Sequence, residues 1–348
     1  MDGRVGVERE RAGRPGANWD ELRVFTWKVL IVALIGGLLF VGWQVADALL
    51  LVFAGVLLAI LLLRATGGVR GLTGLSQAPA FGIVLVVLAA VTVAGFWFMG
   101  STLAAQFSQL SDQLSAGIKQ LPEEVRSQIT DGSLSTALIS RLRTAATGLM
   151  TFLADVVVVV FAGIYLAASP GLYRRGLVLL VPPSGHDRAH EVLDATGEAL
   201  WKWLIGQLIS MALVGMLTYA ALLTLGMPAA LALAVVAAAL EFIPLIGPIL
   251  AAMPAILIGF AVGPTTALWV AGAYLLIQQV EGNLIQPLVQ KKVVSLPPVI
   301  TIAAVVAAGT LFGVMGLFLA APLAVVTLVL VNFLYVRDSL GERPRFPD

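Results

Sequence analysis

The chain contains no cysteine and only two histidines among its 348 residues. The lack of cysteine excludes disulfides, thiolate nucleophiles and cysteine-ligated metal or iron–sulfur sites. Charged residues are also scarce, at 12% of the chain, against roughly 25% in an average soluble domain. The formal net charge is +1, and this near-neutral balance gives no indication of a nucleic-acid partner.

Apolar residues are correspondingly abundant, at 59% of the chain, against roughly 45–50% in soluble proteins. One soluble core cannot absorb this excess, because such cores stop growing at about 250–300 residues. Much of the apolar surface must therefore face lipid, where backbone groups find no water and pair within helices. We expect an all-α polytopic membrane protein whose surroundings are the lipid bilayer.

A membrane span needs roughly 20 apolar residues, and the sequence offers six single candidates: 28–46, 48–63, 80–100, 146–169, 203–225 and 265–285. A seventh apolar stretch, 298–335, is interrupted by glycines and goes out and back, as two full helices or as a deeper hairpin. The stretch 228–263 is interrupted by prolines and is too short for two crossings, so it predicts a re-entrant hairpin. The total is about eight transmembrane helices plus one Pro/Gly-broken hairpin region in the C-terminal third.

The positions of Lys and Arg in short loops predict the orientation. They place both termini and the loop 170–202 in the cytoplasm, and Lys291 and Lys292 require an odd number of crossings in 226–290. Ser184 is a candidate N-cap for a short polar helix in that loop. The predicted parts are a basic cytoplasmic arm, 1–27; helices one to three, 28–100; an extracytoplasmic amphipathic segment, 101–145; helices four and five, 146–225; a transport region with broken helices, 226–335; and a cytoplasmic tail, 336–348.

Glu241 is the clearest functional candidate, because an ionisable group at membrane depth is costly unless it has a role. Pro244, Gly247 and Pro248 follow it closely and free backbone groups at the same depth. Transporters place substrate and ion sites in such broken segments. We interpret Glu241 as a proton- or cation-binding residue; the alternative is that its carboxylate caps the hairpin by accepting backbone amide hydrogens.

Two further groups of residues complete the predicted pathway. Gln278, Glu281, Asn283 and Gln286 form a polar face near the cytoplasmic end of the span 265–285; the alternative is a polar cap at the membrane interface. Gly313 and Gly316 permit a hairpin tip or close helix contact, and plain packing is an equally open interpretation. Gln207, inside span 203–225, is expected to form an interhelical hydrogen bond.

One pair of residues is compatible with an enzyme. His186 and His190 stand four residues apart, as in a zinc site of the H-E-x-x-H type, but Asp187 occupies the position of the catalytic Glu and no third ligand follows. A solvated helix is the simpler interpretation. The sequence has no G-x-S-x-G motif and no phosphate-binding glycine loop, so we expect no cofactor, no metal and no ATP-driven transport within this chain.

The motifs of the C-terminal third resemble the autoinducer-2 exporter family of bacterial permeases. They are, in order, P-L-I-G-P at 244–248, Glu281 and Asn283 with Pro287, Pro297 and Pro298, Gly309, L-F-G at 311–313, Gly316 and Pro322. The resemblance is strongest over 226–335, and the earlier residues share only the layout of spans. It implies an inner-membrane transporter of about eight helices that works as a homo-oligomer. It also points to Glu241, Glu281 and Asn283 as transport residues.

The leading hypothesis is therefore a secondary exporter of a small solute, coupled to a proton or cation gradient. Resemblance to the family suggests autoinducer-2 as the solute and a sodium (or lithium)/proton antiporter as the alternative. A membrane-embedded hydrolase that uses the paired histidines is a second hypothesis. A non-transporting oligomeric scaffold with 101–145 as its interaction arm is a third.

Overall fold

The computed structural model describes residues 19–94, 97, 154–286 and 297–337, and every regular element among these residues is a helix. The chain divides into two compact units, Met1–Asp47 and Ala48–Asp348. The described part of the first unit is the helix α1, Trp19–Gln44, which ends just before the next helix starts. Its stretch Phe25–Gly42 is apolar, and none of that stretch is buried, as expected for a helix whose surroundings are lipid. The predicted all-α fold is thus confirmed.

The second unit starts inside α2, Ala46–Thr73, which packs with the helices Gln77–Ala94 and Ala154–Ala168. Small residues allow close contact here: a Cβ added to Gly55 would lie 2.8 Å from the Cβ of Ala162, and one added to Gly163 would lie 2.8 Å from Leu58. Glycines at such crossings let two apolar helices approach closely where no hydrophobic effect drives them together.

A sharp bend of 87° separates Ala154–Ala168 from the short helix α6, Pro170–Val178. A single turn, Pro183–Gly185, then leads into α7, which runs without a break from His186 to Thr224. The expected Ser184 cap is wrong. The N-cap of α7 is Gly185, which makes no side-chain hydrogen bond, and the polar helix is continuous with the apolar span rather than a separate short element.

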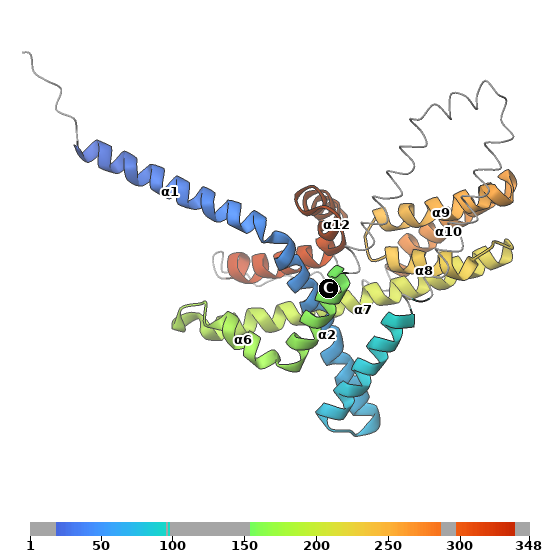
Figure 1. Cartoon of the computed structure of the whole chain (residues 1–348), viewed down its shortest axis with the longest axis horizontal. Coiled ribbons are helices and arrows are strands. Elements are labelled where there is room, and N and C mark those ends of the chain that lie inside the picture. The colour runs from blue at the N-terminus through green and yellow to red at the C-terminus, as the bar shows by residue number, and fades with distance from the viewer. Residues whose placement is uncertain (1–18, 95–96, 98–153, 287–296, 338–348) are drawn as a thin grey trace, which may run out of the picture. The chain divides into compact units, whose positions relative to one another are not determined.

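Three antiparallel helices follow α7: α8, Ala230–Leu240; α9, Ile246–Val262; and α10, Pro264–Val280. The first two form the hairpin predicted for 228–263 (Figure 1). Pro254 was expected to interrupt this stretch, but α9 continues through it. Pro248 occupies the first turn of α9, where proline removes no intrahelical hydrogen bond.

The chain continues through a π-helical turn, Glu281–Ile285, to α12, Pro298–Leu330, and a final π-helical turn, Val331–Arg337. Gly313 has non-helical backbone angles, φ 61° and ψ −140°, and divides α12 into two arms. The arms fold against each other, because Val305 and Ala308 of the first pack with Ala320 of the second. The predicted break in 298–335 is thus a helical hairpin; whether its arms cross the membrane stays open.

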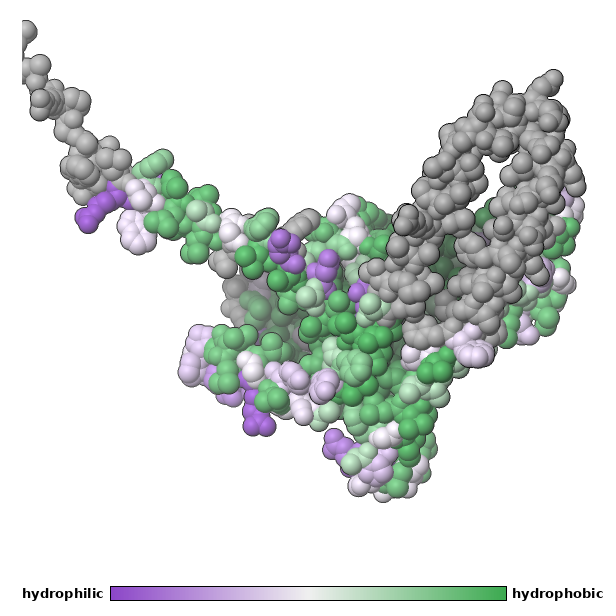
Figure 2. Space-filling model, in the orientation of Figure 1, coloured by the Kyte–Doolittle hydropathy of each residue, from purple (hydrophilic) through white to green (hydrophobic). Residues whose placement is uncertain are grey.

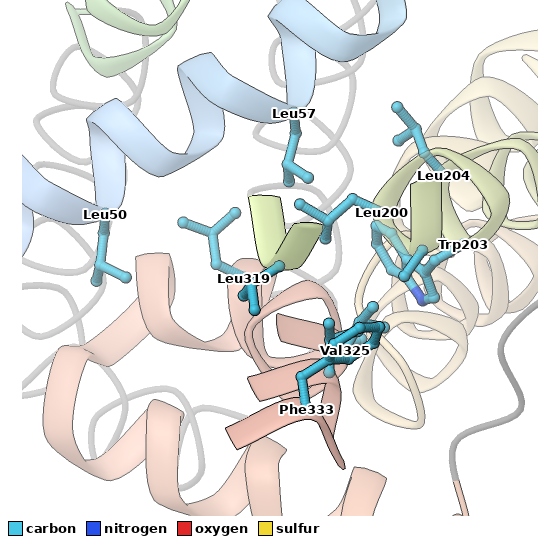
Figure 3. Close-up of a cluster of buried hydrophobic side chains, with 12 residues drawn as sticks. Leu50, Leu57, Leu200, Trp203, Leu204, Leu319, Val325 and Phe333 are labelled. Carbon is cyan, nitrogen blue, oxygen red and sulfur yellow. The ribbon is translucent and has the colours of Figure 1, made fainter. Parts of the chain in front are cut away.

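The largest buried cluster joins α2, α7, the second arm of α12 and the last helical turn (Figure 3). Its labelled members are Leu50, Leu57, Leu200, Trp203, Leu204, Leu319, Val325 and Phe333. The cluster fixes the second arm of α12 against α7. Both broken hairpins are therefore built onto α7, which packs with α8 and with α12.

Within the described residues, five helices are long and apolar enough to span a membrane, or six if the bent pair is counted as one span. Most of the described surface in Figure 2 is apolar, with polar residues confined to patches. The protein is therefore a multi-spanning membrane protein. The number of eight spans remains a prediction, and the segment 101–145, Pro287, Lys291, Lys292 and the tail from 338 onward lie outside the described residues.

Candidate functional site

The first broken hairpin turns tightly between α8 and α9. Leu245 has a positive φ of 67°, rare for a residue with a side chain, and Pro244 precedes it in the turn. Gly247 lies directly against the backbone of α8: an added Cβ would be 1.9 Å from the carbonyl oxygen of Leu240. Only glycine fits a contact of this kind, so the P-L-I-G-P sequence is what allows the helices to fold back immediately after Glu241.

The second broken hairpin uses the same device at Gly313 and Gly316. Gly313 takes the positive φ, and a Cβ added to Gly316 would lie 1.9 Å from the carbonyl oxygen of Ala308. Gly309 faces Leu317 across the hairpin: a Cβ added to Gly309 would lie 2.6 Å from the Leu317 side chain. The hairpin tip and the close helix contact therefore occur together at these glycines, and a place for them on the substrate path stays a prediction.

The two hairpins meet at their tips. The rings of Phe242 and Phe318 lie 6.2 Å apart, and Trp203 of α7 packs edge-on against Phe242 at 5.5 Å. Ile246 packs against the cluster formed by the two arms of α12. Aromatic pairs at these separations add stabilisation beyond their buried area, so a movement of one hairpin must displace the other or break this contact.

Glu241 is the C-cap of α8 and is only 6% exposed. The side-chain amide of Gln207 donates a hydrogen bond to the Glu241 backbone carbonyl at 2.7 Å, which confirms the expected interhelical role of Gln207. The structure shows no hydrogen-bond partner for the Glu241 carboxylate among the described residues. The alternative in which this carboxylate caps the hairpin thus has no support from these residues.

Glu281 is held firmly by two amides. It is 4% exposed, and its carboxylate accepts hydrogen bonds from Gln278 and, at 2.9 Å, from Gln286. The π-helical turn explains the second bond, because its wider coil brings residues five apart onto one side. Asn283 does not join this cluster; it donates to Gln279 at 3.1 Å on the exposed side. The predicted polar face is therefore divided into two groups: Glu281 with its two glutamine donors, and the separate Asn283–Gln279 pair.

The fold brings Glu241 and Glu281 close enough for their charges to repel each other. Among the described residues, no Lys or Arg forms an ion pair with either carboxylate. Burying an unpaired charge costs several kcal/mol, so the two carboxylates need either protonation or a positive counter-charge. The sequence motifs did not reveal that Glu241 and Glu281 lie near each other. The signal was their spacing: a hairpin and one span lie between them and bring the chain back to the same depth.

The paired histidines stand at the N-terminal end of α7. The His186 ring contacts the backbone carbonyl of Val181 at 3.1 Å, and no group of three metal-binding side chains occurs among the described residues. Along the chain, His186 and His190 precede Gln207 by 21 and 17 residues. The contact of His186 is that of a residue at a helix start.

Comparison with known proteins identifies the kind of molecule that contains this site. "Putative transport protein YueF" of Bacillus subtilis is 28% identical over 254 residues, 72% of this chain and 64% of that protein. "Putative permease PerM" of Escherichia coli is 27% identical over 318 residues, covering 85% and 89% of the two chains. "AI-2 transport protein TqsA" of E. coli is 28% identical over 196 residues, covering 56% and 54%.

The chain thus covers less than two thirds of the length of YueF and of TqsA but most of PerM. The sequence model of the family described as "AI-2E family transporter" matches residues 29–335, which include both hairpins and both carboxylates. The resemblance seen in the motifs is therefore confirmed, and the chain belongs to the AI-2E family of transporters.

Proposed function

We propose that the chain is a secondary transporter that exports a small polar solute, with a proton or a sodium ion as the coupling species. The observation that carries the proposal is the pair of buried carboxylates, Glu241 and Glu281, without a basic partner among the described residues. Such a pair can bind a cation or a proton and release it when the surroundings change. This is the property that a gradient-driven transporter needs.

The two glutamates have different roles in this proposal. Glutamine amides fix the Glu281 carboxylate in place, whereas the Glu241 carboxylate has no such partner among the described residues. Glu241 also stands at the C-terminal end of α8, immediately before the turn that meets the second hairpin. We therefore assign binding of the coupling ion to Glu241. Glu281 is the nearby fixed negative charge that favours binding of a cation or a proton there. Movement of the two hairpins would then expose the site to alternate sides.

Autoinducer-2 is the candidate solute, because one relative is named for its transport. A sodium (or lithium)/proton antiporter is the second candidate, since the same carboxylate pair would suit a small cation without any organic solute. A non-transporting scaffold would make no use of the pair, so it predicts that neutralising Glu241 has no effect.

The proposal places the protein in the bacterial inner membrane as a homo-oligomer with both termini in the cytoplasm. Ion pairs within the second unit support this orientation. Arg64 of α2 pairs with Glu198, Arg174 of α6 pairs with Asp194, and Arg337 pairs with Glu191. Basic residues from three places in the sequence thus gather at the N-terminal part of α7. Basic residues favour the cytoplasmic side of a membrane.

The test is efflux from proteoliposomes loaded with autoinducer-2, with and without an imposed proton gradient. The expected result is gradient-dependent efflux by the wild type that falls to the passive leak in Glu241→Gln. Glu198→Gln is the matched control, because it makes the same chemical change at an exposed ion pair. Gradient-dependent efflux that survives in Glu241→Gln would contradict the proposal, and the absence of efflux from the wild type would shift the test to sodium–proton exchange.

A further inference from the structure

Two buried hydroxyl groups lie in the same helical bundle as the carboxylates and have no hydrogen-bond partner among the described residues. Thr218 of α7 is completely buried, and its hydroxyl oxygen is unpartnered; the same holds for the hydroxyl oxygen of Tyr274 of α10. Among the described residues, these two side chains alone have this property. Buried polar groups nearly always have a partner, so each unpartnered hydroxyl indicates a group that the bundle receives from elsewhere.

Thr218 differs from the other helical threonines of the chain. Threonines at five other positions donate to the carbonyl oxygen four residues earlier, at 2.7–2.9 Å: Thr66, Thr73, Thr196, Thr310 and Thr327. This back-bond is the usual way in which a helix satisfies a buried threonine. The Thr218 hydroxyl does not make it, so its bonding capacity remains available to a ligand.

The two hydroxyls lie on the same side of one apolar cluster. Leu222 of α7 and Val270 of α10 both belong to this buried cluster. The two helices run antiparallel, because the chain reverses direction three times between them, before α8, before α9 and before α10. Thr218 lies one turn from Leu222, and Tyr274 one turn from Val270, both on the side that leads to Glu241 and Glu281. The hydroxyls therefore stand between the apolar cluster and the carboxylates.

Helix geometry gives the separation from the carboxylate level. Thr218 is eleven residues beyond Gln207, about 16 Å along α7, and Tyr274 is seven residues before Glu281, about 10 Å along α10, at 1.5 Å per residue. Ser210, a buried polar residue, lies between Gln207 and Thr218 on α7. Polar groups thus occur from the carboxylates to the hydroxyls and stop at the apolar cluster.

We propose that Thr218 and Tyr274 form a hydroxyl subsite that hydrogen-bonds a hydroxyl group inside the transport path. That group belongs either to a neutral hydroxylated solute or to water that accompanies it. The inference rests on the proposed transport function and extends it, because it assigns solute contact to residues other than the glutamates. The apolar cluster around Leu222 and Val270 then closes the path beyond the subsite in this conformation.

The first test compares the KM for autoinducer-2 efflux in proteoliposomes. Thr218→Val and Tyr274→Phe keep the shape of each side chain but remove its hydroxyl. We expect each to raise KM about three- to tenfold, the factor that corresponds to one hydrogen bond, with little change in kcat. Thr218→Ser retains a hydroxyl and should restore a KM close to that of the wild type. Equal impairment by Thr218→Val and Thr218→Ser would indicate a packing role and overturn the proposal.

The second test measures access of water. The native chain has no cysteine, so Thr218→Cys introduces a single thiol for a charged, membrane-impermeant methanethiosulfonate reagent. Met216→Cys is the matched control, because Met216 is two residues away and 60% exposed on the outer side of the bundle. We expect labelling of Thr218→Cys during transport and little labelling of Met216→Cys, since these reagents need a hydrated thiolate.

The two tests together separate the outcomes. A raised KM identifies the solute as the partner, whereas an unchanged KM with labelled Thr218→Cys identifies water. An unchanged KM with no more labelling at Thr218→Cys than at Met216→Cys overturns the hydroxyl subsite. If Glu241→Gln still abolishes gradient-driven efflux in that case, the proposed function stands and only this inference fails.

Discussion

Four glutamates of the described chain lie in two contrasting settings. Glu191 and Glu198 stand near the start of α7, and arginines pair with both. Glu241 and Glu281 lie inside the bundle, where glutamine amides and backbone surround them and no arginine or lysine of the described residues pairs with them. Paired charge at the surface contributes little to stability, whereas charge buried without a partner is strongly destabilising.

The arginines at the first setting also hold an aromatic side chain. Arg188 and Arg337 both lie over the ring of Phe333, at 5.0 and 5.8 Å from its centre, and Arg188 donates to the Phe333 carbonyl at 2.6 Å. Arg64 similarly lies over Trp201. Ion pairs and cation–π contacts therefore connect α2, α7 and the final helical turn in this region. The two hairpins, by contrast, meet through an aromatic contact.

The largest loss of stability is expected from adding a methyl group at Gly247, in the turn of the first hairpin. In Gly247→Ala the new methyl group would overlap the Leu240 carbonyl, and relieving that overlap should cost about 3 kcal/mol of folding free energy. Gly197→Ala is the control beside Glu198, because its added methyl group meets nothing within 4 Å. It should stabilise the helix by up to about 1 kcal/mol. Thermal unfolding in detergent measures both changes.

The next effect concerns the charge of the second buried glutamate. Glu281→Gln removes the negative charge while keeping the size of the side chain, so gradient-driven efflux should fall close to the passive leak. Glu191→Gln makes the same change among the arginines and should leave efflux near the wild-type rate. Equal efflux by the two variants in proteoliposomes would remove the distinction between the buried and the surface pair.

A smaller effect is expected at the contact that positions Glu241. Gln207→Leu leaves the Glu241 carbonyl without its donor, and the loss should lower the free energy of unfolding by about 1 kcal/mol. Gln279→Leu removes an exposed amide contact and should have a much smaller effect. The melting temperatures of the two variants in one detergent check this order, and a reversed order would mean that the Gln207 bond does not support the site.

The smallest effect is expected at the surface pair. Glu198→Gln breaks the ion pair with Arg64, whose side chains are both nearly half exposed. Solvent-exposed pairs contribute about 0.2–1 kcal/mol and are screened by salt. The change in melting temperature should therefore shrink further at high ionic strength. A large fall in melting temperature that persists at high ionic strength would contradict this ranking of the Arg64–Glu198 pair.

The sequence predicted the broken hairpins because their cause is local. Proline and glycine restrict or free the backbone at their own positions, so P-L-I-G-P and Gly313 predict turns without knowledge of the fold. The helix ends were less accurate. Pro254 does not interrupt α9, and α7 begins at His186 with Gly185, not Ser184, as its N-cap, because packing against neighbouring helices outweighs local preference.

The contacts of the site needed the three-dimensional structure. Glu241 and Glu281 were recognised singly, since a carboxylate in an apolar stretch stands out by itself. Their mutual repulsion, the Phe242–Phe318 contact and the position of Thr218 and Tyr274 depend on how α7 to α12 pack. The π-helical turn likewise separates Asn283 from Glu281, which regular helical spacing did not predict.

Cation movement driven by a solute gradient tests the central claim most directly. Proteoliposomes that contain a pH-sensitive dye, or in parallel a sodium-sensitive dye, are given an outward gradient of autoinducer-2. The account predicts that the wild type and Glu198→Gln move protons or sodium against the solute, and that Glu241→Gln does not. Cation movement of wild-type size in Glu241→Gln would contradict the claim that the buried carboxylate pair binds the coupling ion.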